Sequence, residues 1–243
     1  FASSFDKIST KNLIKSKIKI LKIASSEITK LHNLSYAASF KIPMIISTGM
    51  AELPDIAEAI DVCKKIGNNK ICLLHTCSLY PTPLKDLNIL NILKLSKIFG
   101  LPVGLSDHTI GNTAAISAVT LGAKIIEKHI TLNKKSDGPD HFYAAEPQEF
   151  RDYVKKIREC EKLIGKEDIN INPKVRATAR RKSIFIKVNS KKNSIISKNN
   201  IQILNNDARG IDIRYFNYLL GFKFKRNVKK NMPLRWSTIE FKK

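Results

Sequence analysis

The sequence predicts an α/β protein built on a parallel sheet, and within that class a (β/α)8 barrel. Short apolar runs recur about every 20 to 30 residues with helix-like stretches between them, and each run ends in polar residues. Strands that alternate with helices at this spacing are typical of βαβ units. In a barrel of such units, the carboxyl ends of the strands form the catalytic face. An open doubly wound sheet is the alternative, although no GxGxxG motif supports a dinucleotide-binding fold.

The apolar runs are interpreted as buried parallel strands. In chain order they are 20–24, 44–46, 71–74, 103–105 and 125–126, and 1–4 fits an earlier strand. The helix-like stretches include 54–66, 87–99 and 113–121. Ser and Thr at strand ends can simply cap the next helix, but capping does not require the Glu, Asp, His and Lys that also occur there. The strand ends therefore predict a functional face.

Beyond residue 165 the pattern changes. The stretch 166–173 is typical of an exposed linker, and β-like runs at 183–188 and 200–204 precede a helix-like stretch at 215–220. This spacing is too tight for another βα unit. We therefore expect a barrel domain at 1–166, a linker at 167–179 and a small β-rich domain at 180–243.

The composition is that of a globular protein with a large positive charge. Hydrophobic residues make up 43% of the chain and the formal net charge is +22. No apolar run reaches the roughly 18 residues of a membrane span. The charge suggests a nucleic-acid-binding module as one hypothesis, but no zinc-finger, basic-zipper or aromatic RNA-binding signature accompanies it. Four cysteines without a CxxC motif favour a reduced, cytoplasmic protein.

Two histidines, His108 and His129, follow two neighbouring predicted strands. They are about one strand-and-helix unit apart, so both imidazoles should reach the same end of one sheet. A single histidine in such a place is more often structural. Two neutral imidazoles with carboxylates nearby can hold a divalent transition metal. The pair therefore predicts a metal site.

Six motifs in this chain resemble the sialic acid synthase family, the enzymes that make N-acetylneuraminic, legionaminic and related nonulosonic acids. The motifs are KIASSEIT (22–29), ISTGM (46–50), LHTCSLYP (74–81), GLSDHT (104–109), IEKH (126–129) and GPDH (138–141). They occur in the family's order and spacing. The tail, with ARRKS at 179–183 and LG at 220–221, resembles the family's antifreeze-like (SAF) domain.

The resemblance implies a TIM barrel that condenses phosphoenolpyruvate with the open-chain aldehyde form of an N-acylated hexosamine, such as N-acetylmannosamine, and releases phosphate. It implies Mn²⁺, or another divalent ion such as Mg²⁺ or Co²⁺, on His108 and His129, where the ion would polarise the aldehyde oxygen. It also implies a homodimer in which the SAF domain places an arginine over the partner's active site. Arg209 is the nearest candidate for that arginine.

The remaining site residues are implied by position within the matching motifs. The residues expected to bind the phosphate and carboxylate of phosphoenolpyruvate are Lys22, Ser25, Ser47 and Ser106. The residues expected to take part in catalysis are Glu27, Glu127 and Asp140. A lysine charge with several hydroxyl donors suits such an anion. Glu27 is expected near the reacting enol, where it would stabilise positive charge developing at C2, and Glu127 is expected in proton transfer.

Three further residues complete the expected site. Tyr80, together with Asp140, is expected to contact the sugar's hydroxyl groups. Ser78 stands where some family members have a substrate-contacting Asn, which leaves the acceptor sugar open. Asp107, directly before His108, is expected to be a supporting partner of that histidine.

Measured against the family, the sequence begins at the third barrel strand and contains about six of eight units. A start at Phe1 rather than Met fits missing N-terminal sequence. Two alternatives follow from the resemblance. One is a synthase of which this chain is a fragment that does not turn over by itself. The other is a non-catalytic remnant that keeps a pocket for phosphate and metal.

Overall fold

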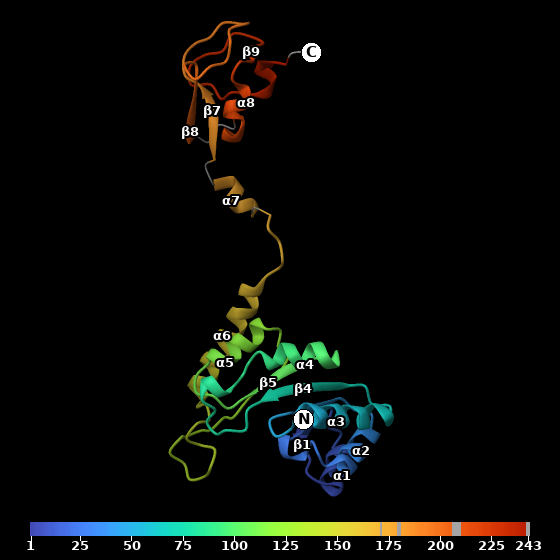
Figure 1. The fold of residues 1–243 in the computed structure, drawn as a ribbon. Coiled ribbons are helices and arrows are strands. Elements are labelled where there is room, and N and C mark those ends of the chain that lie inside the picture. Colours follow the sequence, from blue (N-terminus) through green and yellow to red (C-terminus); the bar gives the residue numbers. More distant parts are fainter. Residues whose placement is uncertain (171, 179–180, 206–209, 242–243) are drawn as a thin grey trace. The chain divides into compact units, whose positions relative to one another are not determined.

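The computed structural model of this chain describes residues 1–170, 172–178, 181–205 and 210–241. The chain divides into two compact units, Phe1–Lys166 and Glu167–Lys243, each of which is described by itself (Figure 1). Among the residues described, no helix is long and apolar enough to cross a lipid bilayer.

The larger unit is built on a six-stranded parallel sheet. Its strands are β1 (Ala2–Ser3), β2 (Leu21–Ile23), β3 (Met44–Ser47), β4 (Ile71–Thr76), β5 (Val103–Asp107) and β6 (Ile126–Lys128). They lie side by side in sequence order, and every neighbouring pair is parallel. The predicted strands and their βαβ pattern are confirmed. A doubly wound sheet reverses its strand order at a switch point, so the observed order excludes that alternative.

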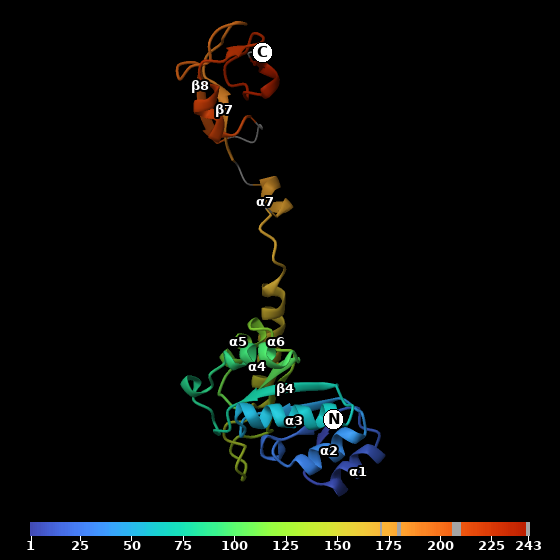
Figure 2. The same ribbon diagram turned by 45° about the vertical axis from the view of Figure 1, so that its right-hand side comes forward.

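Helices follow the strands and lie on one face of the sheet (Figures 1 and 2). They are α1 (Lys7–Lys15), α2 (Leu31–Ser39), α3 (Leu53–Lys65), α4 (Asn91–Phe99), α5 (Thr113–Thr120) and α6 (Pro147–Ile164), with short 3₁₀ turns η1 (Ser25–Glu27) and η2 (Leu84–Asp86). The predicted helices 54–66 and 113–121 are confirmed as α3 and α5. The helix predicted from residue 87 begins only at Asn91, because Asn88 has a positive φ that breaks the helical geometry.

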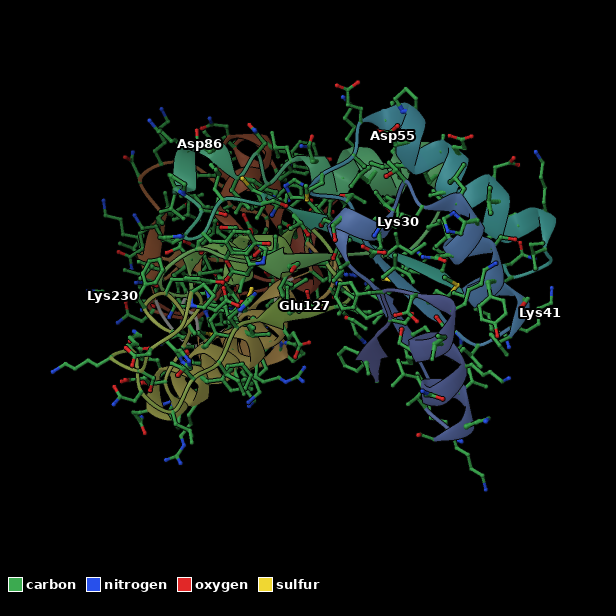
Figure 3. All side chains as sticks on the ribbon, turned by 90° about the horizontal axis from the view of Figure 1, so that it is seen from below. Lys30, Lys41, Asp55, Asp86, Glu127 and Lys230 are labelled. Carbon is green, nitrogen blue, oxygen red and sulfur yellow. The ribbon has the colours of Figure 1, made fainter. Side chains whose placement is uncertain are left out.

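The sheet is curled. Lys22 of β2 lies 3.5 Å from Glu127 of β6, measured from Nζ to Oε1, although three strands lie between them. At about 4.8 Å per strand, a flat sheet would hold these two strands about 19 Å apart. The contact therefore requires the sheet to bend into a half-barrel, with Lys22 and Glu127 on its inner face. In Figure 3, Glu127 lies between the blue first elements of this unit and its green later elements.

The apolar core of this unit fills the space between the outer face of the sheet and the helices. Its strand side chains include Leu21, Ile23, Met44, Ile46, Leu73 and Leu105. Gly104 faces inward, where a Cβ would meet the Ile125 carbonyl oxygen and a methyl group of Leu74. The half-barrel with its outer helix layer fits a (β/α)8 barrel of which six strands are present.

The smaller unit has a core of its own. It contains α7 (Pro173–Thr178), β7 (Lys182–Ile186), β8 (Ile201–Asn205), η3 (Ile213–Tyr215), α8 (Phe216–Leu219), β9 (Lys223–Phe224), η4 (Trp236–Thr238) and β10 (Ile239–Glu240). β7 pairs with β8 and β9 with β10, both antiparallel. Ile184, Leu219 and Phe224 are fully buried in its core. The β-like runs expected near 183–188 and 200–204 are present as β7 and β8.

Candidate active site

The alternation of side chains along the strands brings the candidate residues to the inner face. Residues paired in register on parallel strands point to the same side of a sheet. Ser106 on β5 is in register with Thr76 on β4 and with Glu127 on β6. Because Glu127 meets Lys22 across the half-barrel, these side chains share one interior.

Lys22, Ser106 and Glu127 form one hydrogen-bonded group near the carboxyl ends of the strands. Ser106 Oγ donates to Glu127 Oε1 at 2.6 Å, the same oxygen that lies 3.5 Å from Lys22 Nζ. Lys22 is only 6% exposed. Burial lowers the pKa of Lys22, an effect that the Glu127 carboxylate opposes. Lys22 thus points inward, where its Nζ also lies 3.5 Å from the Ile23 carbonyl oxygen.

Two further hydroxyl groups of the predicted site are buried without a partner. Among the residues described, Ser47 Oγ and Ser78 Oγ have no hydrogen bond. An unpaired buried polar group is uncommon and indicates a place where a ligand or water completes the structure. Ser25 Oγ already accepts a hydrogen bond from the Gly49 amide at 3.1 Å. Gly49 also packs against Ser78, whose Oγ would lie 2.6 Å from a Cβ added there.

Glu27 makes a different contact from those of the Lys22 group. Its Oε1 accepts a hydrogen bond from Lys30 at 2.8 Å, and Ser26 Oγ lies 3.4 Å from the same oxygen. Its second oxygen, Oε2, is buried without a hydrogen-bond partner in the described part of the chain. One oxygen of this buried carboxylate is therefore held in place while the other is free.

His108 and His129 lie together, with ring centroids 5.3 Å apart. His108 Nδ1 lies 2.9 Å from the carbonyl oxygen of Cys77. A carbonyl can only accept, so Nδ1 carries the proton and Nε2 keeps its lone pair. Burial lowers the pKa of His108, which favours this neutral form. Tyr80 packs against His108 with centroids 4.2 Å apart.

His129 is held by a side chain that the sequence did not single out. Tyr143 OH donates to Asp140 Oδ1 at 2.7 Å, and the same phenol oxygen lies 3.3 Å from His129 Nδ1. Because the only phenol proton goes to Asp140, the phenol oxygen accepts from Nδ1–H. Burial and Asp140 raise the pKa of Tyr143, so the phenol stays protonated. The one sequence signal for Tyr143 is its position just after the motif at 138–141.

The donor set fits a divalent ion with two protein ligands. In both imidazoles Nδ1 lies beside an oxygen that accepts a hydrogen bond, which leaves Nε2 as the nitrogen that could bind a transition metal. Within the described ranges, no group of three or more His, Cys, Asp or Glu side chains is arranged to hold a metal. Water or substrate oxygen would have to supply the other ligands, which suits an ion that binds a substrate carbonyl.

Two expectations take another outcome. Asp107 is expected to be a supporting partner of His108, but it makes no hydrogen bond to that imidazole in the described residues, where the partner of His108 Nδ1 is the Cys77 carbonyl. Asp107 is in register with Lys128 and points to the opposite face of the sheet. Arg209, the candidate for an arginine over the partner's site, lies outside the described residues.

Comparison with known proteins identifies the family. Residues 1–169 match the model of the NeuB family. The chain is 36% identical over 242 residues to the pseudaminic acid synthase of Helicobacter pylori, covering 99% of this chain and 71% of that protein. It is 37% identical over 246 residues to the N,N'-diacetyllegionaminic acid synthase of Legionella pneumophila, covering 98% and 68%. The chain belongs to the NeuB family, which is a sialic acid synthase-type family.

Solved structures agree with this assignment. The N-acetylneuraminic acid (sialic acid) synthetase of Leptospira borgpetersenii, solved in complex with citrate, superposes with a TM-score of 0.68 at 33% identity. The superposition covers 72% of this chain and 61% of that one. The half-barrel is thus the arrangement that this part of the sequence has in a relative.

Proposed function

We propose that this chain carries the main part of a nonulosonic acid synthase site, which condenses phosphoenolpyruvate with an N-acylated hexosamine. The observation that supports the proposal most strongly is the buried Lys22–Glu127–Ser106 group beside the His108–His129 pair. Ser106 and His108 are two residues apart on one strand path, about 7 Å along it. An anion on the first group would therefore lie next to an ion on the second.

The residues divide between the two substrates. The phosphate and carboxylate of phosphoenolpyruvate would be bound by Lys22 with the free hydroxyl of Ser47 and the hydroxyl of Ser106. Asp140 and Tyr80 would contact the sugar's hydroxyl groups beside the histidines. A divalent ion such as Mn²⁺, when bound, supplies polarisation of the aldehyde oxygen.

Each chemical step needs a group that the chain supplies. C3 of phosphoenolpyruvate forms a bond to the aldehyde carbon, and the new alkoxide takes up a proton. Water then adds at C2 and releases one proton, which balances the proton taken up by the alkoxide. The C2–O bond breaks with its electrons going to the departing phosphate, and the C2 hydroxyl gives up its proton as the ketone forms. Glu127 exchanges the proton, since it already shares one with the Ser106 hydroxyl through a 2.6 Å hydrogen bond. The free oxygen of Glu27 stabilises positive charge developing at C2.

The open side of the half-barrel is expected to prevent turnover by this chain alone. In the described residues β1 and β6 pair with one strand each, and the edges are not joined. Phe1 beside β1 and Val154 of α6 line one apolar cavity along this opening. We therefore expect the chain alone to bind phosphoenolpyruvate but not to release phosphate from it, because a site open to water loses preorganisation.

The test compares the chain with a chimera that carries, ahead of Phe1, the first two strand-and-helix units of the Helicobacter pylori relative. Mn²⁺, phosphoenolpyruvate and N-acetylmannosamine or a diacetamido hexosamine are supplied, and phosphate release is measured. Release by the chimera that requires both substrates is the expected result. A chimera that folds and binds phosphoenolpyruvate but never turns over would favour the alternative, a non-catalytic remnant. Clear turnover by the chain itself would show that closure of the barrel is dispensable.

The proposal extends to the assembly. We infer that the smaller unit is the family's SAF domain and that the chain acts as a homodimer. Support for this comes from the family motifs in the tail and from the independent core of that unit.

A further inference from the structure

A buried ion pair lies on the outer face of β5 and β6, directly behind the two histidines. Lys128 Nζ lies 3.0 Å from Asp107 Oδ2, and the two side chains are 4% and 0% exposed. Asp107 and Lys128 are in register on neighbouring strands. Each precedes a histidine in the chain, so the pair and the histidines alternate between the two faces of the sheet.

Every acceptor position of the Asp107 carboxylate is used. Oδ1 accepts from the Thr109 amide at 2.8 Å and from the Thr109 hydroxyl at 2.7 Å. Oδ2 accepts from Lys128 and, at 2.8 Å, from the phenol of Tyr153 on α6. Burial and the Asp107 charge raise the pKa of Tyr153, which keeps this donor protonated. A carboxylate held by four donors has one orientation.

Lys128 joins this carboxylate to the backbone. Its ammonium also donates to the Thr109 carbonyl oxygen and lies 5.3 Å from the centre of the Tyr153 ring. Asp107 and Thr109 are the two chain neighbours of His108, and Lys128 is the chain neighbour of His129. The Lys128 ammonium thus links the residues on both sides of His108 to the residue that precedes His129.

We propose that Lys128 and Asp107 are positioning residues that set the separation and orientation of the His108 and His129 imidazoles. This inference rests on the proposed function, in which His108 and His129 are two ligands of one ion and the ion pair holds them in place. A buried ion pair is a weak device for stability, since well-packed apolar residues often replace one without loss. Its best-attested use is to fix register, which is what two ligands on two different strands require.

The test replaces the pair together, Asp107→Asn with Lys128→Met, so that no single buried charge is left behind. Tyr153→Phe is a milder second variant that removes one donor to Asp107. The matched control is Cys160→Ala, which loosens the packing of α6 where Cys160 meets Thr120 on α5, away from the ion pair. The measurements are the imidazole NMR signals of His108 and His129 in metal-free protein, the affinity for Co²⁺, and thermal unfolding in EDTA.

The double variant is expected to shift both imidazole signals and to weaken Co²⁺ binding by about 10- to 100-fold, the usual effect of removing groups that orient metal ligands. Cys160→Ala should lower the unfolding temperature and leave the signals and the affinity unchanged. Imidazole signals that are the same in the double variant, in Tyr153→Phe and in the parent chain would overturn the inference.

The two proposals fail separately. A parent chain that binds no Co²⁺ removes the proposed ion, but the imidazole signals of metal-free protein still decide whether Lys128 and Asp107 position the rings. If the double variant unfolds, Tyr153→Phe decides in the same way. A drop in unfolding temperature with unchanged imidazole signals would assign the pair to stability alone.

Discussion

Replacing His108 by Gln is expected to lower the affinity of the chain for Mn²⁺ or Co²⁺ by about 100-fold or more. The His108 imidazole is one of two metal ligands that the protein offers, and its Nδ1 proton is held by the Cys77 carbonyl. The side-chain amide of glutamine is a much poorer ligand for these ions than an imidazole. Changing groups behind a ligand already costs 10- to 100-fold, so removing the ligand itself should cost at least as much. Isothermal titration, or the visible spectrum of bound Co²⁺, measures the effect.

The control for this variant is His32→Gln. His32 is exposed on α2 and lies outside the predicted site. This variant should bind the ion as the parent chain does. If both variants bind equally well, the ion sits elsewhere and the two-histidine site is wrong.

Replacing Lys22 by Met is expected to weaken binding of phosphoenolpyruvate by about 10- to 100-fold. A charged hydrogen bond contributes about 1.5 to 3 kcal/mol, and Lys22 supplies the buried cation nearest Glu127 and Ser106. Methionine keeps much of the length of the lysine side chain, so the loss of affinity measures the contribution of the positive charge. The control is Lys65→Met, because Lys65 forms a surface ion pair with Asp61 on α3. Equal loss in both variants would mean that binding is a general effect of net charge.

The pH dependence of this binding follows from the same burial. Lys22 binds an anion only while it is protonated, and burial lowers its pKa below the ordinary 10.5. Affinity for phosphoenolpyruvate should therefore be lost as pH rises through that lowered pKa. The loss should occur at a lower pH than it would if an exposed lysine bound the anion. In Lys22→Met this alkaline loss should be absent.

The strand ends were the part of the site that the sequence could predict. Side chains alternate along a strand, and the βαβ pattern sends all strands the same way, so His108, His129 and Ser106 had to meet at one end of the sheet. The same pattern predicted a parallel sheet but left a doubly wound sheet as the alternative, which only the observed strand order excludes. Lys22 was predicted to face inward with them, which its contact with Glu127 confirms.

Contacts between loops were beyond the sequence pattern. Nothing in the motif that contains Glu27 indicates that Lys30 donates a hydrogen bond to one oxygen of the Glu27 carboxylate. Asp107 was assigned to His108 because the two are adjacent, whereas alternation turns adjacent strand residues to opposite faces. Tyr143 lies in an irregular segment, where no periodicity indicates which side chain turns inward. These contacts depend on tertiary packing rather than on local pattern.

On the proposed function, one end of this half-barrel binds phosphoenolpyruvate beside a metal ion. The most direct test is the ³¹P relaxation of phosphoenolpyruvate in the presence of the chain and Mn²⁺, because a paramagnetic ion speeds relaxation only of nuclei close to it. We expect many-fold faster relaxation with the parent chain than with Mn²⁺ alone, and loss of the effect in both His108→Gln and Lys22→Met. Relaxation no faster than that with Mn²⁺ alone, or an effect that survives in both variants, would contradict the account.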